Sequence, residues 1–424
     1  MKTRATLLLA LVLLAFVAPA WAQQLLPSGK PEQVGMSSQR LDRVGQMLKA
    51  QIERERFPGA VAIVARKGKI VYFEAFGQRD PQTGAPMSKD AIFRLYSMTK
   101  PFTSVAAMML VEDGKLTLAD PVSKHLPQLA KLQVAVAKQD ADGKTSYTLV
   151  PAANEITIQD LLRHTSGIVY GGFTPNSHIK EAYAANKVGW DDQTPEEQLE
   201  RLAKVPLAHQ PGTVWEYSLS TDILGRVVEK VSGTTLGAVL NERLFAPLKM
   251  PDTSFVVPQG KVARLAQPYA VDKATGNPIK MLDVTVQQKN DAGGAGSAGT
   301  AADYARFCQM LLNGGQLNGV RLLGRATVAY MATDHLDTIK TAVPNALAGY
   351  GFGLGFSVRK NDGVSNLIGS TGEYGWGGAA GTTFWIDPKE QVIGIVMTQT
   401  NFGTAAQRLD RGLFRHAVYQ ALTN

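Results

Sequence analysis

A serine and a lysine stand one helical turn apart at Ser97 and Lys100. On one face of a helix, this spacing brings the lysine amine beside the serine hydroxyl. A hydroxyl is a weak nucleophile until a neighbouring base takes its proton, and a lysine amine or a tyrosinate can be that base. Tyr217 and the stretch Trp376-Gly377-Gly378, far along the chain, fit the same chemistry. Together these residues predict nucleophilic catalysis through an acyl-serine.

Ser-x-x-Lys is a short pattern that also occurs by chance, and context separates its occurrences. Ser177 follows a turn-like stretch, and Ser357 ends an apolar segment that runs into a polar surface turn. After Lys100, in contrast, Pro101 opens an apolar run typical of a buried helix, which puts Ser97 at or just before the helix start. Free backbone N–H groups and the positive end of the helix dipole favour a developing oxyanion there. The alternative for Ser97 is a plain helix N-cap.

Residues 1–22 are predicted to form a cleavable signal peptide. Lys2 and Arg4 precede an apolar stretch, and Ala20-Trp21-Ala22 offers small residues for cleavage. The expected location is therefore the bacterial periplasm or the exterior, with no membrane span left after cleavage; an uncleaved anchor is the alternative. Loss of Lys2 and Arg4 takes the formal net charge from +8 to +6. Because that charge is scattered, it favours solubility over nucleic-acid binding.

The order of apolar patterns predicts an α+β fold, in which helices flank an antiparallel sheet and a mostly helical domain is inserted. We expect a sheet domain from residues 23–112 and 291–424, and a helical domain from residues 113–290, with a substrate cleft between them. The segment 134–155 is expected to be a polar surface loop. The remaining expected elements are a helix over 37–52, a hairpin over 60–76, strands over 350–358, 381–386 and 392–398, and a last helix over 405–422.

Cysteine and histidine usage argues against disulfide and metal chemistry. The single cysteine, Cys308, excludes an internal disulfide and has a helical context that favours buried packing. An exported chain without disulfides fits a bacterial envelope. The histidines show no metal-ligand spacing, so we expect no metal and no cofactor, and His164 is expected to fix a loop. The chain also lacks a Gly-x-Ser-x-Gly nucleophile elbow and a phosphate-binding loop.

Several motifs jointly resemble those of the serine β-lactamase-related superfamily, which has a penicillin-binding fold. The resemblance is to its class C-like branch, which includes the family VIII carboxylesterases, and it covers nearly the whole chain after residue 22. Residues 93–102 match the nucleophile segment, and Tyr217 follows Pro211-Gly212 as in that branch. The stretches 158–167, 299–307 and 350–355 look like further hallmarks of it.

The resemblance implies a role for each candidate residue. Ser97 would be the nucleophile, and Lys100 would assist its deprotonation. Tyr217 would act as general base in acylation and then protonate the leaving group. The backbone N–H groups of Ser97 and Ala379 would form the oxyanion hole, and Trp376-Gly377-Gly378 would replace the Lys-Thr-Gly strand of true β-lactamases.

Two departures from the β-lactamase pattern favour an ester substrate. Leu219 stands where the family's Tyr-x-Asn motif carries an asparagine that grips the amide of the β-lactam side chain, and Trp376 stands where a lysine helps to hold the β-lactam carboxylate. Both changes should weaken binding of an anionic amide, whereas apolar contact suits a neutral ester.

We therefore expect a carboxylesterase acting on short- to medium-chain esters, with weak or no β-lactamase activity. The expected partner is a small-molecule ester substrate, and no oligomeric state is indicated. The alternatives are a β-lactamase or D-amino acid peptidase, an acyltransferase of the same fold, and a binding protein without catalytic activity.

Overall fold

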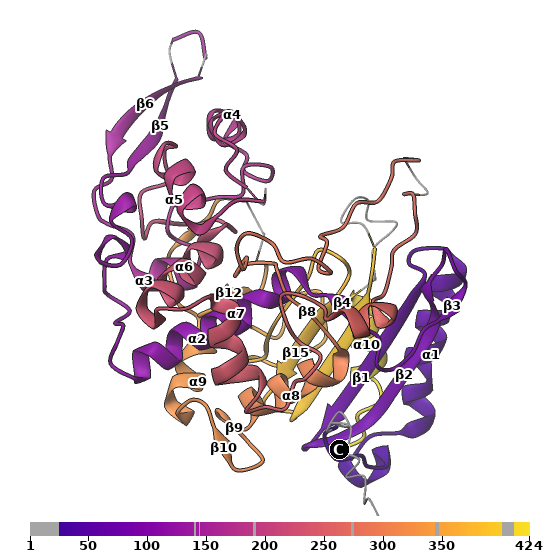
Figure 1. The fold of residues 1–424 in the computed structure, drawn as a ribbon. Helices are drawn as coiled ribbons and strands as arrows, with labels where there is room; N and C mark the ends of the chain where they lie inside the picture. Colours follow the sequence, from indigo (N-terminus) through magenta and orange to yellow (C-terminus); the bar gives the residue numbers. More distant parts are fainter. Residues whose placement is uncertain are drawn as a thin grey trace, which may run out of the picture.

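The computed structural model describes residues 25–139, 141–143, 145–189, 192–272, 275–343, 347–400 and 411–424 (Figure 1). The predicted signal peptide lies outside these residues, as does the first part of the predicted last helix. Within the described ranges, no helix combines the length and the apolar character needed to cross a membrane.

An eight-stranded antiparallel sheet runs in the order β12-β13-β14-β15-β16-β1-β2-β3. The first and last parts of the chain therefore meet in its middle, where Ala60 of β1 lies opposite Thr398 of β16. The strands are β1 (Gly59–Arg66), β2 (Lys69–Asp80), β3 (Ala85–Pro86), β12 (Tyr350–Phe352), β13 (Ser357–Arg359), β14 (Tyr374–Gly377), β15 (Thr383–Asp387) and β16 (Val392–Thr398).

Both faces of this sheet are buried under helices. Side chains alternate along a strand, and β1 is buried at every position, so its residues divide between two cores. Ala60, Ala62 and Val64 pack with the helices α1 (Ser38–Glu53) and α10 (Arg411–Tyr419). The alternate residues of β1 face the larger core, where α8 (Ala301–Leu312) covers β1, β15 and β16. Figure 1 shows α1 beside β2 at the edge of the molecule.

Most of the remaining helices lie between residues 100 and 331, beside the sheet (Figure 1). The α-helices there are α2 (Lys100–Glu112), α3 (Ile158–Leu162), α4 (Ser177–Ala185), α5 (Pro195–Ala203), α6 (Ser220–Ser232), α7 (Leu236–Leu240) and α9 (Arg325–Met331). Single 3₁₀ or π turns span Pro31–Val34, Tyr96–Thr99, Val122–Lys124, Pro127–Leu129, Asn241–Phe245 and Gln259–Arg264.

Four short strand pairs complete the fold, and the pair closest to the candidate nucleophile joins β4 to β8. These small sheets consist of β4 (Phe93–Arg94) with β8 (Ala298–Gly299), β5 (Gln133–Gln139) with β6 (Thr145–Pro151), β7 (Val214–Trp215) with β11 (Lys340–Thr341), and β9 (Gln316–Leu317) with β10 (Val320–Arg321).

Helix α2 is the central helix of the larger core. Pro101 occupies its first turn, where the missing N–H costs no hydrogen bond, and nearly all of its side chains are buried. The ring of Phe102 contacts Phe245, Tyr304 and Phe307, with centroids 4.7 to 5.1 Å apart. Helices α6 and α7 also pack against α2. Because α2 is held on several sides, side chains at its first turn are placed rigidly.

The predicted α+β arrangement, with an antiparallel sheet flanked by helices, is confirmed. The helix at 37–52, the hairpin at 60–76 and the strand at 392–398 also match. Cys308 is buried in α8, as expected. The division into domains at residues 112 and 290 stays a prediction.

Two local expectations are wrong. The segment 350–358 is a hairpin of β12 and β13 rather than one strand, because Gly355 takes a left-handed φ of 110° between them. The segment 134–155 contains the paired strands β5 and β6, which project at the end of the molecule far from the sheet (Figure 1). Ser177 follows a turn, as expected, and it opens α4, which Asn176 caps by accepting the Ile179 N–H.

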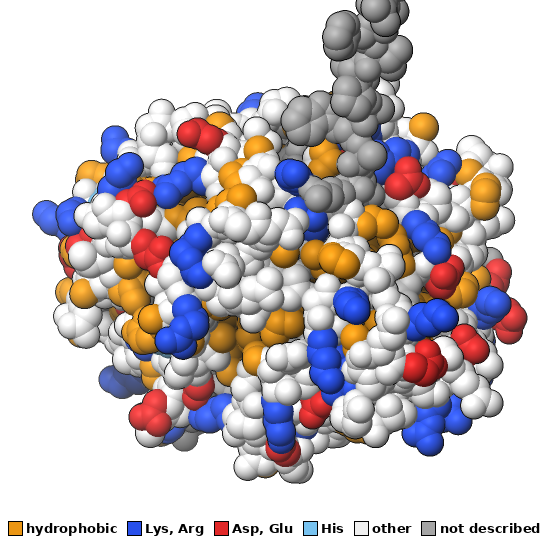
Figure 2. All heavy atoms as spheres, turned by 90° about the horizontal axis from the view of Figure 1, so that it is seen from below, with side chains coloured by type: hydrophobic (Ala, Val, Ile, Leu, Met, Phe, Trp, Pro, Cys, Tyr) orange, Lys and Arg blue, Asp and Glu red, His pale blue; other side chains and the backbone are white. Residues whose placement is uncertain are grey.

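Charged side chains of both signs are present on the face of the molecule displayed in Figure 2. Figure 2 shows Lys and Arg side chains interspersed with Asp and Glu on the face that it displays. This distribution agrees with the scattered charge of the sequence and offers no continuous basic stripe on that face.

Candidate active site

Ser97 lies on the 3₁₀ turn Tyr96–Thr99, which leads directly into α2. Its side chain is 7% exposed and lines a large cleft. The preceding Tyr96 has a φ of 47°, a left-handed conformation that is unfavourable for a residue with a side chain. The Leu282 N–H donates to the Tyr96 hydroxyl over 2.9 Å and helps to hold this turn. Backbone strain therefore occurs directly beside the candidate nucleophile.

Lys100 is the first residue of α2 and is fully buried, one turn after Ser97. Its Nζ donates to the Tyr170 hydroxyl over 2.9 Å and to the Gly294 carbonyl oxygen over 2.8 Å. The same nitrogen lies 4.7 Å from the ring centroid of Tyr217 and 5.3 Å from that of Tyr170. The amine is thus fixed between two tyrosine rings, which attract a cation over their faces.

Tyr217 belongs to the segment just before α6, and its ring lies in an aromatic cluster. Its centroid is 5.4 Å from that of Tyr170, 4.9 Å from that of His164 and 5.2 Å from that of Trp376. The Tyr217 hydroxyl accepts a hydrogen bond of 3.2 Å from the indole Nε1 of Trp376. A donor to this oxygen stabilises its ionised form more than its neutral form.

His164 is buried and contacts the segment that carries Tyr217. Its Nδ1 lies 2.9 Å from Ser218 Oγ, which in turn lies 2.7 Å from Ser220 Oγ. Burial holds the pKa of His164 well below its ordinary value, and the nearby Lys100 lowers this pKa further. A neutral imidazole bonded to the loop agrees with the structural role expected from the sequence.

The segment Trp376–Ala379 lies on the opposite wall of the cleft, at the end of β14. It touches the nucleophile segment directly: a Cβ at Gly378 would lie 2.3 Å from the Leu95 carbonyl oxygen, so only glycine fits there. Thr382 Oγ1 also donates to that oxygen over 3.4 Å. The backbone of the turn at Ala379 is thereby brought close to the Ser97 turn.

The cleft has a volume of about 1060 Å³ and is bounded by residues from distant parts of the chain. Ser97, Tyr217 and the Trp376–Ala379 segment all line this cleft. Lys100 is fully buried and is not among the residues that line it. Much of the remaining wall is aromatic or aliphatic, and it includes Tyr170, Phe173, Trp215, Ile279, Met281, Leu282, Val343 and Leu347.

Leu219 is the predicted site residue that does not lie with the others. It is 3% exposed, is the N-cap of α6 and packs in the larger core. Among the described residues that line the cleft, Leu219 is absent. The side chain therefore occupies core volume instead of the cleft wall.

The structure places Tyr170, Asp222 and Gly294 close to Lys100. The sequence patterns did not identify these three as site residues. Asp222 Oδ1 accepts the Gly294 N–H over 3.1 Å. Burial raises the pKa of Asp222, while Lys100 and the Gly294 N–H act to lower it. In the sequence, only the adjacent glycines Gly293 and Gly294 could have indicated this part of the site, because glycines often mark a close approach of backbone to other groups. Nothing in the sequence alone says which groups approach.

Over the part of the chain that the structure describes, no group of three or more His, Cys, Asp or Glu side chains is arranged to hold a metal ion. The chemistry available at this site is that of a hydroxyl, an amine and a phenol.

Comparison with known proteins identifies the family. The sequence model of the Beta-lactamase family matches residues 44–418. An uncharacterized protein of Mycobacterium tuberculosis is 38% identical over 351 residues, which cover 80% of this chain and 85% of that protein. Esterase EstB of Burkholderia gladioli is 30% identical over 403 residues, which cover 89% of this chain and 94% of EstB.

Among solved structures, EstCE1, described as a hydrolase with promiscuous acyltransferase activity, superposes with a TM-score of 0.74 at 29% identity. It covers 90% of this chain, and the match spans 99% of EstCE1. The likeness extends over most of the chain, and it confirms the β-lactamase/transpeptidase-like fold. The chain belongs to the Beta-lactamase family as a serine hydrolase of that fold, and its esterase neighbours support the family VIII esterase branch.

Proposed function

We propose that the protein is a serine carboxylesterase for short- to medium-chain esters that works through an acyl-enzyme on Ser97. The observation that carries this proposal is the convergence of Ser97, the buried Lys100 amine and the Tyr217 ring at one cleft with a largely apolar wall. Esterase EstB and the hydrolase EstCE1, which the chain resembles over most of its length, support the same chemistry.

In the proposed acylation step, the Tyr217 oxygen takes the proton of Ser97 Oγ while Oγ attacks the ester carbonyl carbon. Lys100, as an ammonium over the Tyr217 ring, stabilises the phenolate that accepts this proton. The carbonyl oxygen becomes an oxyanion that accepts hydrogen bonds from the backbone N–H groups of Ser97 and Ala379. Tyr217 then gives its proton to the leaving alkoxide, and the alcohol departs.

Deacylation uses the same groups in reverse roles. Water gives a proton to Tyr217 as its oxygen attacks the acyl carbon, and the collapse of the second tetrahedral intermediate returns that proton to Ser97 Oγ. An alcohol that takes the place of water in this step would receive the acyl group. EstCE1 is described as having such acyltransferase activity, and the width of the cleft leaves room for an acceptor, so acyl transfer is the second candidate function.

An ester is proposed over a β-lactam because of the group at position 376. Where β-lactamases use a cation to hold a carboxylate, this cleft carries an indole whose N–H is bonded to Tyr217. A carboxylate that loses its cation at this position binds less well, whereas a neutral ester requires no such partner. The cleft is also lined by Lys280, Arg411 and Arg415, but Arg411 bonds the Gly378 and Thr382 carbonyl oxygens and Arg415 bonds the Glu373 carboxylate.

The location is part of the same proposal: cleavage after Ala22 and release into the periplasm or the medium. Mass spectrometry of the protein recovered from the periplasmic fraction of a Gram-negative host should give a chain that begins at Gln23. Recovery of uncleaved protein in the membrane fraction would contradict it.

The test of activity uses p-nitrophenyl acetate, butyrate and octanoate, with nitrocefin as the β-lactam. Ser97→Ala should lower ester turnover by about 10⁴-fold or more, because loss of a catalytic nucleophile has effects of that order. Ser177→Ala is the matched control, since Ser177 begins the same Ser-x-x-Lys spacing but is exposed on α4. Ester turnover that persists in Ser97→Ala excludes the mechanism, and dominant nitrocefin turnover excludes the ester preference. Transfer to added butanol that exceeds hydrolysis would favour the acyltransferase.

A further inference from the structure

Gly294 lies between the candidate catalytic lysine and a buried carboxylate. Its carbonyl oxygen accepts from Lys100 Nζ over 2.8 Å, and its N–H donates to Asp222 Oδ1 over 3.1 Å. A Cβ at this position would lie 2.2 Å from Asp222 Oδ2, so the contact requires glycine. One residue without a side chain thus links the amine on α2 to the carboxylate on α6.

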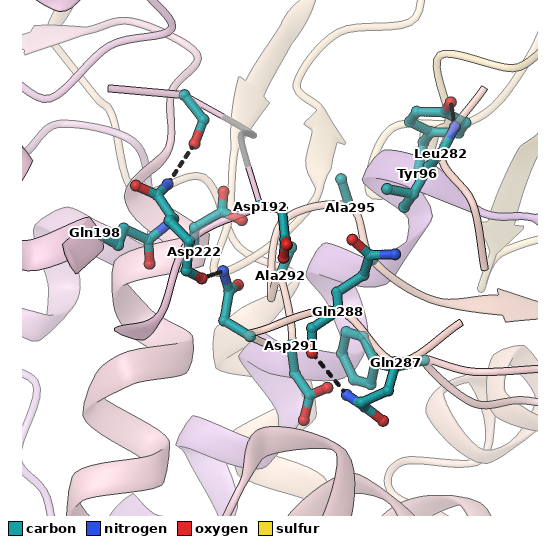
Figure 3. Close-up of a pocket in the computed structure, with 15 residues that line it drawn as sticks. Tyr96, Asp192, Gln198, Asp222, Leu282, Gln287, Gln288, Asp291, Ala292 and Ala295 are labelled. Atoms are coloured by element: carbon teal, nitrogen blue, oxygen red, sulfur yellow. Dashed lines mark hydrogen bonds between the residues drawn. The ribbon is translucent and has the colours of Figure 1, made fainter. Parts of the chain in front are cut away.

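Asp222 lies in the first turn of α6 and is 1% exposed. Burying a carboxylate costs several kcal/mol unless a cation and hydrogen bonds compensate, so a partner is required. Among the described residues, Oδ2 has no hydrogen-bond partner, and Asp222 lines a small pocket of about 60 Å³ next to the cleft (Figure 3). Tyr96 and Leu282 line both spaces and separate them.

The charges around Asp222 point to Lys100 as its compensating cation. Burial raises the pKa of Asp222, and two cations act against this rise: Lys100 on α2 and, more weakly, Arg226 in the next turn of α6. Arg226 has another carboxylate nearby, because its Nη1 lies 3.1 Å from Glu229 Oε2. The titratable groups that face Lys100 itself are Asp222 and the three rings Tyr170, Tyr217 and His164.

We infer that Asp222 is a positioning residue for catalysis: its carboxylate places a negative charge near the Lys100 amine and, through Gly294, fixes where that amine lies. This inference rests on the proposed function. Its consequence is a division of roles, in which Tyr217 takes the proton of Ser97 Oγ and Lys100 keeps its own proton throughout. Asp222 does not line the ester cleft, so it acts through Lys100 and not on the substrate.

The test is Asp222→Asn, which keeps the size of the side chain and an oxygen that can accept the Gly294 N–H, but removes the charge. Without the anion, the ammonium and the phenol both lose a proton more readily. The rising limb of log(kcat/KM) against pH should therefore move to lower pH, by about one unit for the loss of a charge in a buried site. A weaker base also lowers the plateau, by about tenfold, while KM stays unchanged.

Asp291→Asn is the matched control. Asp291 is also buried, lines the same pocket (Figure 3) and accepts a backbone N–H, that of Gly237, over 2.8 Å. The Lys100 amine bonds Tyr170 and Gly294, and Asp291 accepts from Gly237 instead, so the pH profile of Asp291→Asn should match that of the parent enzyme. An unchanged midpoint in Asp222→Asn, or the same shift in Asp291→Asn, would overturn the inference.

A second measurement leaves Asp222 intact, in case Asp222→Asn does not fold. With ¹³Cε-labelled lysine, the signal of Lys100, assigned by its loss in Lys100→Arg, should keep its ammonium shift across the rising limb of activity. A signal that loses its proton in step with the rate makes Lys100 the base and overturns the inference. Failure of the proposed function looks different, because the parent enzyme would then show no turnover of esters that depends on Ser97.

Discussion

The indole Nε1 of Trp376 donates to the hydroxyl oxygen of Tyr217 over 3.2 Å. The sequence pattern assigns Trp376 to substrate contact, but the structure also bonds it to the proposed general base. Trp376 belongs to β14 of the sheet, and Tyr217 belongs to the segment before α6, so this bond joins two separate parts of the cleft wall. A change at position 376 should therefore alter proton transfer as well as binding.

Trp376→Phe keeps an aromatic ring but removes the donor to Tyr217. A hydrogen bond to an ionised group contributes about 1.5–3 kcal/mol, so kcat/KM for p-nitrophenyl butyrate should fall by about 10- to 100-fold. The phenolate loses a stabilising donor, and the rising limb of the pH profile should move to higher pH. This shift is opposite in direction to that expected for Asp222→Asn.

Trp215→Phe is the control for this prediction. Trp215 also lines the cleft, but its Nε1 has no hydrogen-bond partner among the described residues. Its removal should leave the midpoint of the pH profile in place. A midpoint that moves equally in both variants would show that loss of an indole, and not of the bond to Tyr217, is responsible.

Gly378→Ala should lower ester turnover by about 100-fold while the protein remains folded. The new methyl group would lie 2.3 Å from the Leu95 carbonyl oxygen, so the turn after β14 must move away from the Ser97 turn. A displacement of about 1 Å in catalytic geometry can cost about 100-fold in rate. Gly172→Ala is the control, because a Cβ there meets no atom within 4 Å. Full activity in Gly378→Ala would exclude an oxyanion hole that includes Ala379.

Leu219→Asn should lower stability and should not create β-lactamase activity. The side chain is buried in the core, so the substitution removes apolar packing and buries an amide, at a combined cost of about 2–4 kcal/mol. Urea unfolding gives this free energy, and Leu149→Asn, at a position 46% exposed on β6, should change it little. Gain of nitrocefin turnover in Leu219→Asn would show that position 219 reaches the substrate.

Acidification should destabilise the protein through His164. Its pKa is held well below the ordinary value in the folded state, so the unfolded chain binds a proton near pH 6.5 that the folded chain does not. The free energy of unfolding should fall as the pH drops below 6.5, with this residue contributing about 1.4 kcal/mol per unit until its folded pKa is reached. Urea unfolding between pH 7.5 and 5.5 measures the slope.

His164→Gln should flatten that slope by up to one proton, and His178→Gln serves as the control. His178 lies against the Tyr147 ring outside the buried site, with centroids 4.8 Å apart. Equal slopes for His164→Gln and the parent would mean that His164 is protonated in the folded protein.

Elements with a strong local pattern could be predicted from the sequence. Helix α1 has its apolar stripe and Ser37 as N-cap, and β1 and β2 are apolar runs joined by a two-residue turn. The residues of the catalytic motifs could also be named, because the resemblance rests on several spaced matches taken together. Local pattern and motif thus gave the fold class and the principal candidates.

The rest depended on contacts between distant segments. In the sequence, Asp222 looks like an ordinary acidic residue in the first turn of a helix. Only the fold links it to Lys100, because Gly294 accepts from the Lys100 amine and donates to the Asp222 carboxylate. Leu219 aligns with a substrate-binding position, yet it faces the core. The β5–β6 hairpin was missed because its side chains are mostly exposed and give little alternation of apolar and polar residues.

The pairing of β1 with β16 sets a condition on biosynthesis. β1 pairs with β2 directly after it, but its other neighbour, β16, is available only when residues 392–398 have been translated. The turn at Ser97 also depends on later residues, because it contacts Gly378 and Leu282. Contacts of such long sequence separation form late and slowly. A ribosome-bound chain that already contains Ser97, Lys100 and Tyr217 would therefore have no competent nucleophile. The enzyme would become reactive only after its synthesis is nearly complete.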